Sequence, residues 1–256
     1  MLLIGCIVVA GVINSKLFSR ITNLNPDSIE TSLTSSNFCR RKTSFTIEPR
    51  FTRALSLLIE RTSNSNPQNA TLALRTYLGS IAPCLDIQYC SDPQMQSAEG
   101  YFTFSEETAN RDRLLICVSE SYKQEDDLLT ATLIAHEATH AIQFVLDATG
   151  TTYGKIYQKT CYGKESMAFT EEVLFLKSLT QGELESVFAR MFDASLANSK
   201  IGGIRSLVNI AIQSGERCRE YKYNTENTTL CTIALITTNM EKMVRSSPFY
   251  QTECAQ

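Results

Sequence analysis

Residues 133–143 read LIAHEATHAIQ and contain His136, Glu137 and His140. Apolar residues in the surrounding segment 126–147 recur at helical spacing, so we expect the three residues on one helix. Four residues advance a helix by just over one turn, which directs both imidazoles from the same face toward one metal ion. The chain has 2 histidines in all, and both belong to this pattern. The stretch therefore predicts a metal site carried by a helix.

Zinc is the metal that this pattern indicates. Zn²⁺ binds imidazole nitrogens and lowers the pKa of a bound water to about 7, and Glu137 is placed to take the proton as a general base. A catalytic zinc site needs a third protein ligand and an open fourth position. Because the chain has no third histidine, that ligand is expected to be a carboxylate or a thiolate. The candidates are Glu165, Glu171, Glu172, Cys161 and Asp147. The ordinary alternatives are a solvated helix face for Glu171 and Glu172 and a disulfide for Cys161.

The motif HEATH, followed by ExxAFxxE at residues 165–172, resembles the gluzincin branch of zinc metallopeptidases, the thermolysin-like class. The resemblance covers roughly residues 98–180. It implies that two histidines on one helix and a glutamate on the next, antiparallel helix hold Zn²⁺, with a small residue after the glutamate that lets the helices pack closely. Glu165 with Ala168 matches that role. Glu171 is then the alternative ligand or an outer support for the site.

The chain departs from this class in one respect. Members often carry a downstream histidine that stabilises the transition state, and this chain has none. A tyrosine hydroxyl is the expected substitute donor. The candidates are Tyr153, Tyr157 and Tyr162.

The rest of the pattern predicts an α+β fold that is mainly helical, in a single domain over residues 51–256. Three short segments rich in β-branched and aromatic residues predict a small antiparallel sheet, with the last two as a hairpin. They are 84–90, 100–104 and 113–119. Helices are expected at 51–62, 70–79, 126–147, 164–179, 181–197, 202–215 and 229–245. The resemblance implies a zincin-like core, with the sheet packed on the motif helix and strand 113–118 along the cleft as the edge to which a substrate strand adds.

The N-terminal segment and the cysteines indicate the cellular compartment of the protein. Residues 2–13 are an apolar run too short to span a membrane comfortably, so residues 1–16 are expected to be a secretory signal or an anchor, followed by an arm over 17–50. Outside the leader lie eight cysteines, an even number without CxxC pairs, which favours disulfides in an oxidising compartment. The pairs closest in sequence are Cys84 with Cys90 and Cys218 with Cys231.

Composition and motif together predict a secreted zinc metalloendopeptidase that acts on a peptide or protein. The net charge of −3 argues against a general nucleic-acid binder, and membrane contact is expected only through the leader. Two alternatives stay open: a non-catalytic secreted zincin-like scaffold, and a zinc hydrolase with a non-peptide substrate. An open groove beside strand 113–118 favours a peptide, and a small closed pocket favours a small molecule.

Overall fold

The structure is a computed structural model. It describes residues 47–64, 72–91, 99–103, 114–149, 160–191 and 225–255, with short pieces between 209 and 218. The predicted leader 1–16, nearly all of the predicted arm 17–50, most of the predicted helix 202–215, and Tyr153 and Tyr157 lie outside the described residues.

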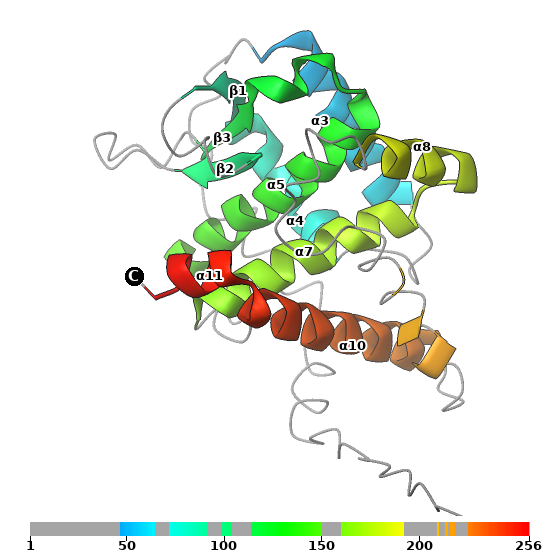
Figure 1. Cartoon of the computed structure of the whole chain (residues 1–256). Helices are drawn as coiled ribbons and strands as arrows, with labels where there is room; N and C mark the ends of the chain where they lie inside the picture. Colours follow the sequence, from blue (N-terminus) through cyan, green and yellow to red (C-terminus); the bar gives the residue numbers. More distant parts are fainter. Residues whose placement is uncertain are drawn as a thin grey trace, which may run out of the picture.

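Helices dominate the described chain, and a small sheet lies at one end of them (Figure 1), which confirms the mainly helical α+β class. The longer helices are α3 (Pro49–Asn64), α4 (Leu72–Ile81), α5 (Asp127–Thr149), α7 (Cys161–Lys177), α8 (Gln181–Met191) and α10 (Thr225–Ser246). The strands are β1 (Leu85–Cys90), β2 (Gly100–Thr103) and β3 (Leu114–Ser119). Short helical segments complete the set: η1 (Ala82–Cys84), η3 (Glu120–Gln124) and α11 (Pro248–Glu253).

The sheet is mixed, with the strand order β1-β3-β2. β2 pairs antiparallel with β3, as the predicted hairpin requires, but β1 pairs parallel with β3, so the prediction of an antiparallel sheet is wrong for β1. Apolar alternation marks a strand without encoding the direction in which it pairs with its neighbour. Because β3 is central, the prediction that a substrate strand adds to 113–118 is wrong as well; β2 covers that edge.

Helix α5 lies in the middle of the molecule, against α3, α4, α7 and β2 (Figure 1). Its first turn is capped by Asp126, whose carboxylate accepts a hydrogen bond from Leu129 N at 2.7 Å. Apolar side chains occur on several sides of the helix, and Ile134, Ala138 and Leu146 are all fully buried. A helix buried on several sides can support polar groups out of water, provided that they pair with one another.

Strand β2 approaches α5 closely at Gly100. A Cβ on this residue would lie 3.1 Å from both the carbonyl oxygen of Cys117 and the side chain of Leu133, which is tighter than ordinary contact. Two residues later, the ring of Phe102 packs against that of Phe144 on α5, with centroids 5.8 Å apart. The sheet therefore lies directly on the helix that carries the two histidines.

Three disulfides join described cysteines: Cys90–Cys117, Cys161–Cys254 and Cys218–Cys231. The predicted pair Cys218–Cys231 is confirmed, and the predicted pair Cys84–Cys90 is wrong. Cys84 directly precedes β1 and Cys90 is its last residue, so the extended strand separates them by about 20 Å, whereas bridged Cα atoms lie within about 7 Å. The three bonds indicate an oxidising compartment.

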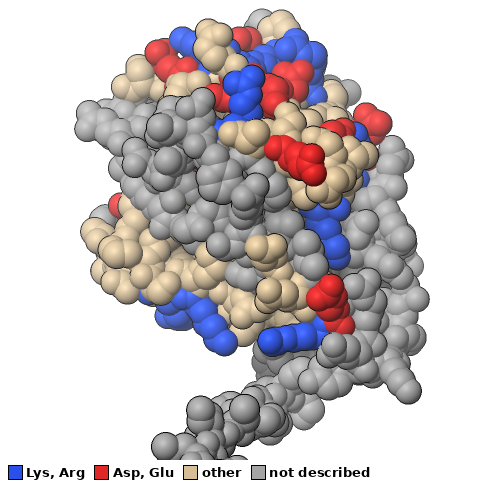
Figure 2. All heavy atoms as spheres, turned by 45° about the vertical axis from the view of Figure 1, so that its right-hand side comes forward, with Lys and Arg blue, Asp and Glu red and all other residues tan. Residues whose placement is uncertain are grey.

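The described surface carries charges of both signs. Basic and acidic side chains are interspersed on the face shown in Figure 2. Within the described residues, no helix combines the length and the apolar character needed to cross a membrane.

Candidate metal centre

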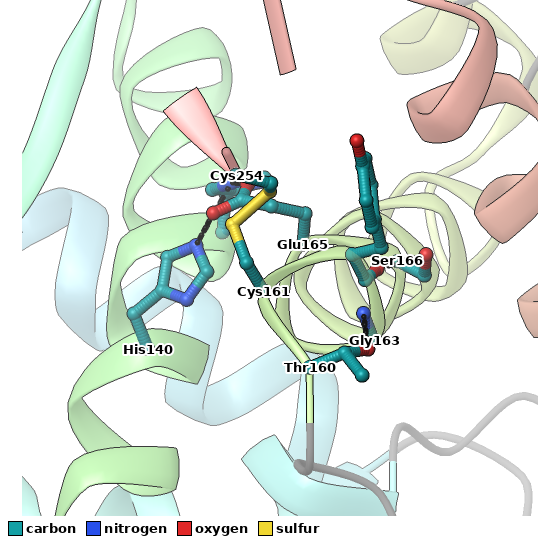
Figure 3. The surroundings of a disulfide bond; sticks show 9 residues. His140, Thr160, Cys161, Gly163, Glu165, Ser166 and Cys254 are labelled. Atoms are coloured by element: carbon teal, nitrogen blue, oxygen red, sulfur yellow. Dashed lines mark hydrogen bonds and ion pairs between the residues drawn. A yellow bond between two sulfur atoms is a disulfide. The ribbon is translucent and has the colours of Figure 1, made fainter. Parts of the chain in front are cut away.

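His136 and His140 on α5 and Glu165 on α7 place three ligand atoms together. The two Nε2 atoms lie 3.3 Å apart. The Glu165 carboxylate faces both rings, with Oε2 3.6 Å from His136 Nε2 and Oε1 3.5 Å from His140 Nε2. Figure 3 shows the contact between His140 and Glu165 across the two helices. The first choice among the predicted third ligands is thus the one that the structure brings to the histidines.

The spacing of these atoms suits a small tetrahedral ion. Ligands about 2.0–2.1 Å from a tetrahedral Zn²⁺ are separated from one another by about 3.3 Å. The two nitrogens lie 3.3 Å apart in the structure, and each lies 3.5–3.6 Å from a different oxygen of the Glu165 carboxylate, so all three contacts are within a few tenths of an ångström of that value. The residues present therefore fit a divalent ion with two nitrogen ligands and one carboxylate, and a cluster of this kind can hold a metal.

The second nitrogen of each imidazole also has a partner. His140 Nδ1 lies 3.0 Å from Gln143 Oε1, and Gln143 Nε2 donates to the Lys164 carbonyl at 3.0 Å, which fixes the orientation of the amide. Nδ1 of His140 is consequently the donor, and Nε2 keeps its lone pair for a metal. His136 Nδ1 lies 3.3 Å from Glu172 Oε2, an ion-pair distance whose geometry falls short of a hydrogen bond.

Charge interactions between the two imidazoles and the Glu165 carboxylate shift the pKa values of all three groups. Burial alone would lower the pKa of His136 and His140, but interactions with the nearby carboxylates, Glu165 first among them, outweigh it and raise both pKa values. Burial would likewise raise the pKa of Glu165, but the two imidazoles hold it well below its usual range. Glu165 is therefore a carboxylate in a positive environment, which is the state in which it can bind a cation.

Glu137 lies on α5 between the two histidines in sequence and is buried, with 5% of its surface exposed. Burial raises its pKa, and the neighbouring imidazoles lower it less than burial raises it. The carboxylate accepts a hydrogen bond from the backbone of Phe102 on β2, which ties it to the sheet. A buried carboxyl group with a raised pKa beside a cluster that can hold a metal is suited to accept and return a proton.

The other candidate ligands have different roles. Cys161 forms a disulfide with Cys254, which confirms the predicted alternative to a thiolate ligand. Asp147 pairs with Lys164 at 3.0 Å. Tyr162, a candidate hydroxyl donor, has its ring 4.5 Å from the guanidinium of Arg245.

Glu171 caps another helix. Its carboxylate accepts hydrogen bonds from Ala73 N at 2.9 Å and Leu74 N at 3.5 Å, two of the unpaired amides at the start of α4. Glu171 is 1% exposed, so the solvated alternative is wrong, and its carboxylate lies at the start of α4 and outside the cluster of His136, His140 and Glu165. Six residues turn a helix by about 600°, so Glu171 faces roughly 120° away from Glu165.

We expect Glu171→Gln to lower the free energy of unfolding by about 1.5–3 kcal/mol, because it weakens buried hydrogen bonds that a charged group accepts. Zinc affinity should not change. Denaturant unfolding and a competition titration with a chromophoric chelator measure the two quantities. An exposed glutamate, Glu185→Gln, is the control; a loss of zinc by Glu171→Gln would return this residue to the list of ligands.

Glu172 takes the supporting position that was predicted for Glu171. Seven residues after Glu165 it returns to the same face of α7, and it is buried beside His136 rather than solvated. We expect Glu172→Gln to weaken zinc binding by about 10–100-fold, the usual cost of losing a carboxylate that orients a metal-binding imidazole. The same chelator competition measures it. An affinity equal to that of the wild type would contradict the role.

Three further residues around the site were not predicted. Gln143 follows His140 by three residues in the quoted stretch, so the i,i+3 rule for helix neighbours would have found it. Glu99 accepts a hydrogen bond from the Tyr122 hydroxyl at 3.0 Å, and burial raises its pKa. Tyr250 comes from α11, and its pKa is raised well above the ordinary value by burial and by nearby carboxylates. No sequence signal connects Glu99 or Tyr250 with the motif.

Comparison with protein-family models, with curated proteins and with solved structures finds no match to this chain. The geometry of the site is therefore the basis on which we infer a function.

Proposed function

We propose that this chain is a zinc-dependent peptidase of the oxidising, secretory environment. The observation that carries the proposal is the cluster of His136 Nε2, His140 Nε2 and the Glu165 carboxylate, whose two oxygens each face one of the nitrogens, with the buried Glu137 beside them. Two histidines and one glutamate leave a fourth position for water or substrate, which is the arrangement of catalytic zinc sites. Zinc bound there supplies Lewis-acid chemistry, activating a water and polarising a carbonyl group.

The chain's own residues supply the proton transfer. Glu137 is the carboxylate placed to accept a proton from the attacking water and to deliver it to the leaving amine. Its hydrogen bond from the Phe102 backbone fixes its direction, so the carboxylate does not need to reorganise during the reaction. Gln143 and Glu172 hold the two imidazoles in place.

The position of β2 supports an extended peptide as substrate. Ser119 N donates to Glu99 O at 2.8 Å, so Glu99 and Ser119 form a hydrogen-bonded pair of the antiparallel ladder. Because such pairs alternate with non-hydrogen-bonded ones, the backbone N–H and C=O groups of Gly100 and Phe102 point away from β3. The contact of Phe102 with Glu137 shows that this outer side of β2 runs beside the proposed base. An extended peptide that lay along β2 would bring its backbone to Glu137, as strand addition does in other peptide-binding proteins.

The test is detection of new chain termini. The oxidised protein is incubated with zinc and a mixture of unfolded proteins, and new termini are identified by mass spectrometry. We expect termini with the wild type, none after removal of the metal by a chelator, and recovery on adding zinc. Folded protein that holds zinc and produces no termini from any of the mixture would contradict the peptidase proposal and favour the scaffold or a non-peptide substrate.

A further inference from the structure

The Cys161–Cys254 disulfide lies beside the metal centre. Cys161 is the first residue of α7, and Cys254 follows directly after α11. Figure 3 shows the bond next to Glu165 and His140. Glu165 is one turn after Cys161, and Tyr250 is one turn before Cys254, so each lies near the disulfide on its own helix. The bond therefore joins the turn of α7 that carries Glu165, a candidate metal ligand, to the end of α11, which carries Tyr250.

Tyr250 reaches the centre through two ring contacts. Its ring meets that of Phe169 edge to face, with centroids 6.0 Å apart, and Phe169 meets His136 in the same way at 4.4 Å. Burial and then the carboxylates of Glu165 and Glu137 raise the pKa of Tyr250, so the phenol stays protonated and able to donate. Its hydroxyl has no hydrogen bond to any residue in the described part of the chain. A half-buried hydroxyl donor near the centre is thus available to a ligand.

The helix that carries Tyr250 is short, and contacts with α10 and α7 and the disulfide hold it in place. α11 has six residues, begins at Pro248, and contains no buried residue. A helix this short is not stable alone, so its position depends on its neighbours. The disulfide is the covalent link between this helix and α7.

We propose that Tyr250 donates a hydrogen bond to the ligand in the metal centre and that the Cys161–Cys254 disulfide positions it there. The ligand group is an oxygen that carries or develops negative charge, such as the carbonyl oxygen of a peptide during hydrolysis. The inference rests on the proposed function. It assigns to the C-terminal helix the hydrogen-bond donor that the sequence was expected to supply from residues 153–162.

The experiment measures binding of acetohydroxamate to the zinc-loaded, oxidised full chain by calorimetry, beside the zinc content of each sample. For Tyr250→Phe, we expect a dissociation constant raised by about 10–100-fold, the effect of losing a hydrogen bond to a charged ligand, with zinc content unchanged. The double variant Cys161→Ser/Cys254→Ser should show a loss of similar size. Adding Tyr250→Phe to that double variant should cost nothing further, because the hydroxyl is already displaced.

Two controls separate positioning from general stability. Tyr162→Phe removes a hydroxyl from the neighbouring helix, and Cys218→Ser/Cys231→Ser removes another disulfide; both should bind acetohydroxamate as the wild type does. Equal affinity of wild type and Tyr250→Phe at equal zinc content overturns the role of Tyr250. Additive losses from Tyr250→Phe and the cysteine pair overturn the positioning role. Folded wild type without zinc would instead contradict the proposed function, on which both depend.

Discussion

Glu137→Gln is expected to lower the rate of peptide hydrolysis by about 10²–10⁴-fold, the contribution of a positioned general base. The amide keeps the size of the side chain and an oxygen that can accept the hydrogen bond from the Phe102 backbone, so the fold should persist. Zinc content should stay that of the wild type, because Glu137 is not among the three candidate ligands. The measurement is the rate on a peptide derived from the termini found with the wild type, together with zinc analysis of the same samples.

The matched control for this variant is Glu99→Gln, another buried carboxylate near the centre that is hydrogen-bonded to Tyr122. It should retain most of the activity. A Glu137→Gln enzyme that works at the wild-type rate would assign the base to another residue.

Glu165→Gln is expected to abolish stoichiometric zinc binding, since it replaces the one carboxylate that faces both imidazoles with a neutral amide. The effect should exceed the 10–100-fold loss expected for an outer residue such as Glu172. The free energy of unfolding, measured with and without zinc, detects the same loss of zinc binding. Zinc at about 100 times its dissociation constant adds about 2.7 kcal/mol to the free energy of unfolding of a protein that binds it, and we expect this gain in the wild type and its absence in the variant.

Glu171→Gln is the control on the same helix, because it also neutralises a buried glutamate of α7. The wild-type Glu171 side chain caps α4 and does not face the histidines. The variant should lose stability in the absence of zinc and still gain stability when zinc is added. If Glu165→Gln gained the same zinc-dependent stability as the wild type, Glu165 would not be a ligand.

The part of the site that follows from local geometry could be predicted from the sequence. His136, Glu137 and His140 are neighbours on one helix, and the helix period alone decides that the two imidazoles share a face. Gln143 obeys the same rule. The third ligand needed the family resemblance, because no local rule brings a residue of α7 to a residue of α5.

The functions of Glu171 and Glu172 show where prediction from sequence ends. The two are adjacent, and no local pattern distinguishes the surroundings of their side chains. Each residue turns the helix by about 100°, so the rotation of α7 against α5 sends Glu172 to His136 and Glu171 to the start of α4. That rotation is set by the packing of the whole helix and not by either residue.

Contacts between distant segments were not predictable for the same reason. The parallel pairing of β1 with β3 is not encoded in the apolar pattern of either strand, and the bond between Cys90 and Cys117 depends on that pairing, which sets Cys117 opposite Gln88. Tyr250 belongs to α11, and its place beside the metal centre depends on the packing of α10 and on a disulfide to the start of α7. Such contacts arise when the helices assemble.

The most direct test of the account is an anomalous-scattering map of crystals of the zinc-loaded protein, recorded above and below the zinc absorption edge. The account predicts one peak per chain, within about 2.0–2.2 Å of His136 Nε2, His140 Nε2 and an oxygen of Glu165. Glu137 and Glu172 should lie outside bonding distance. The absence of a peak between α5 and α7, or a peak coordinated without Glu165, would contradict it.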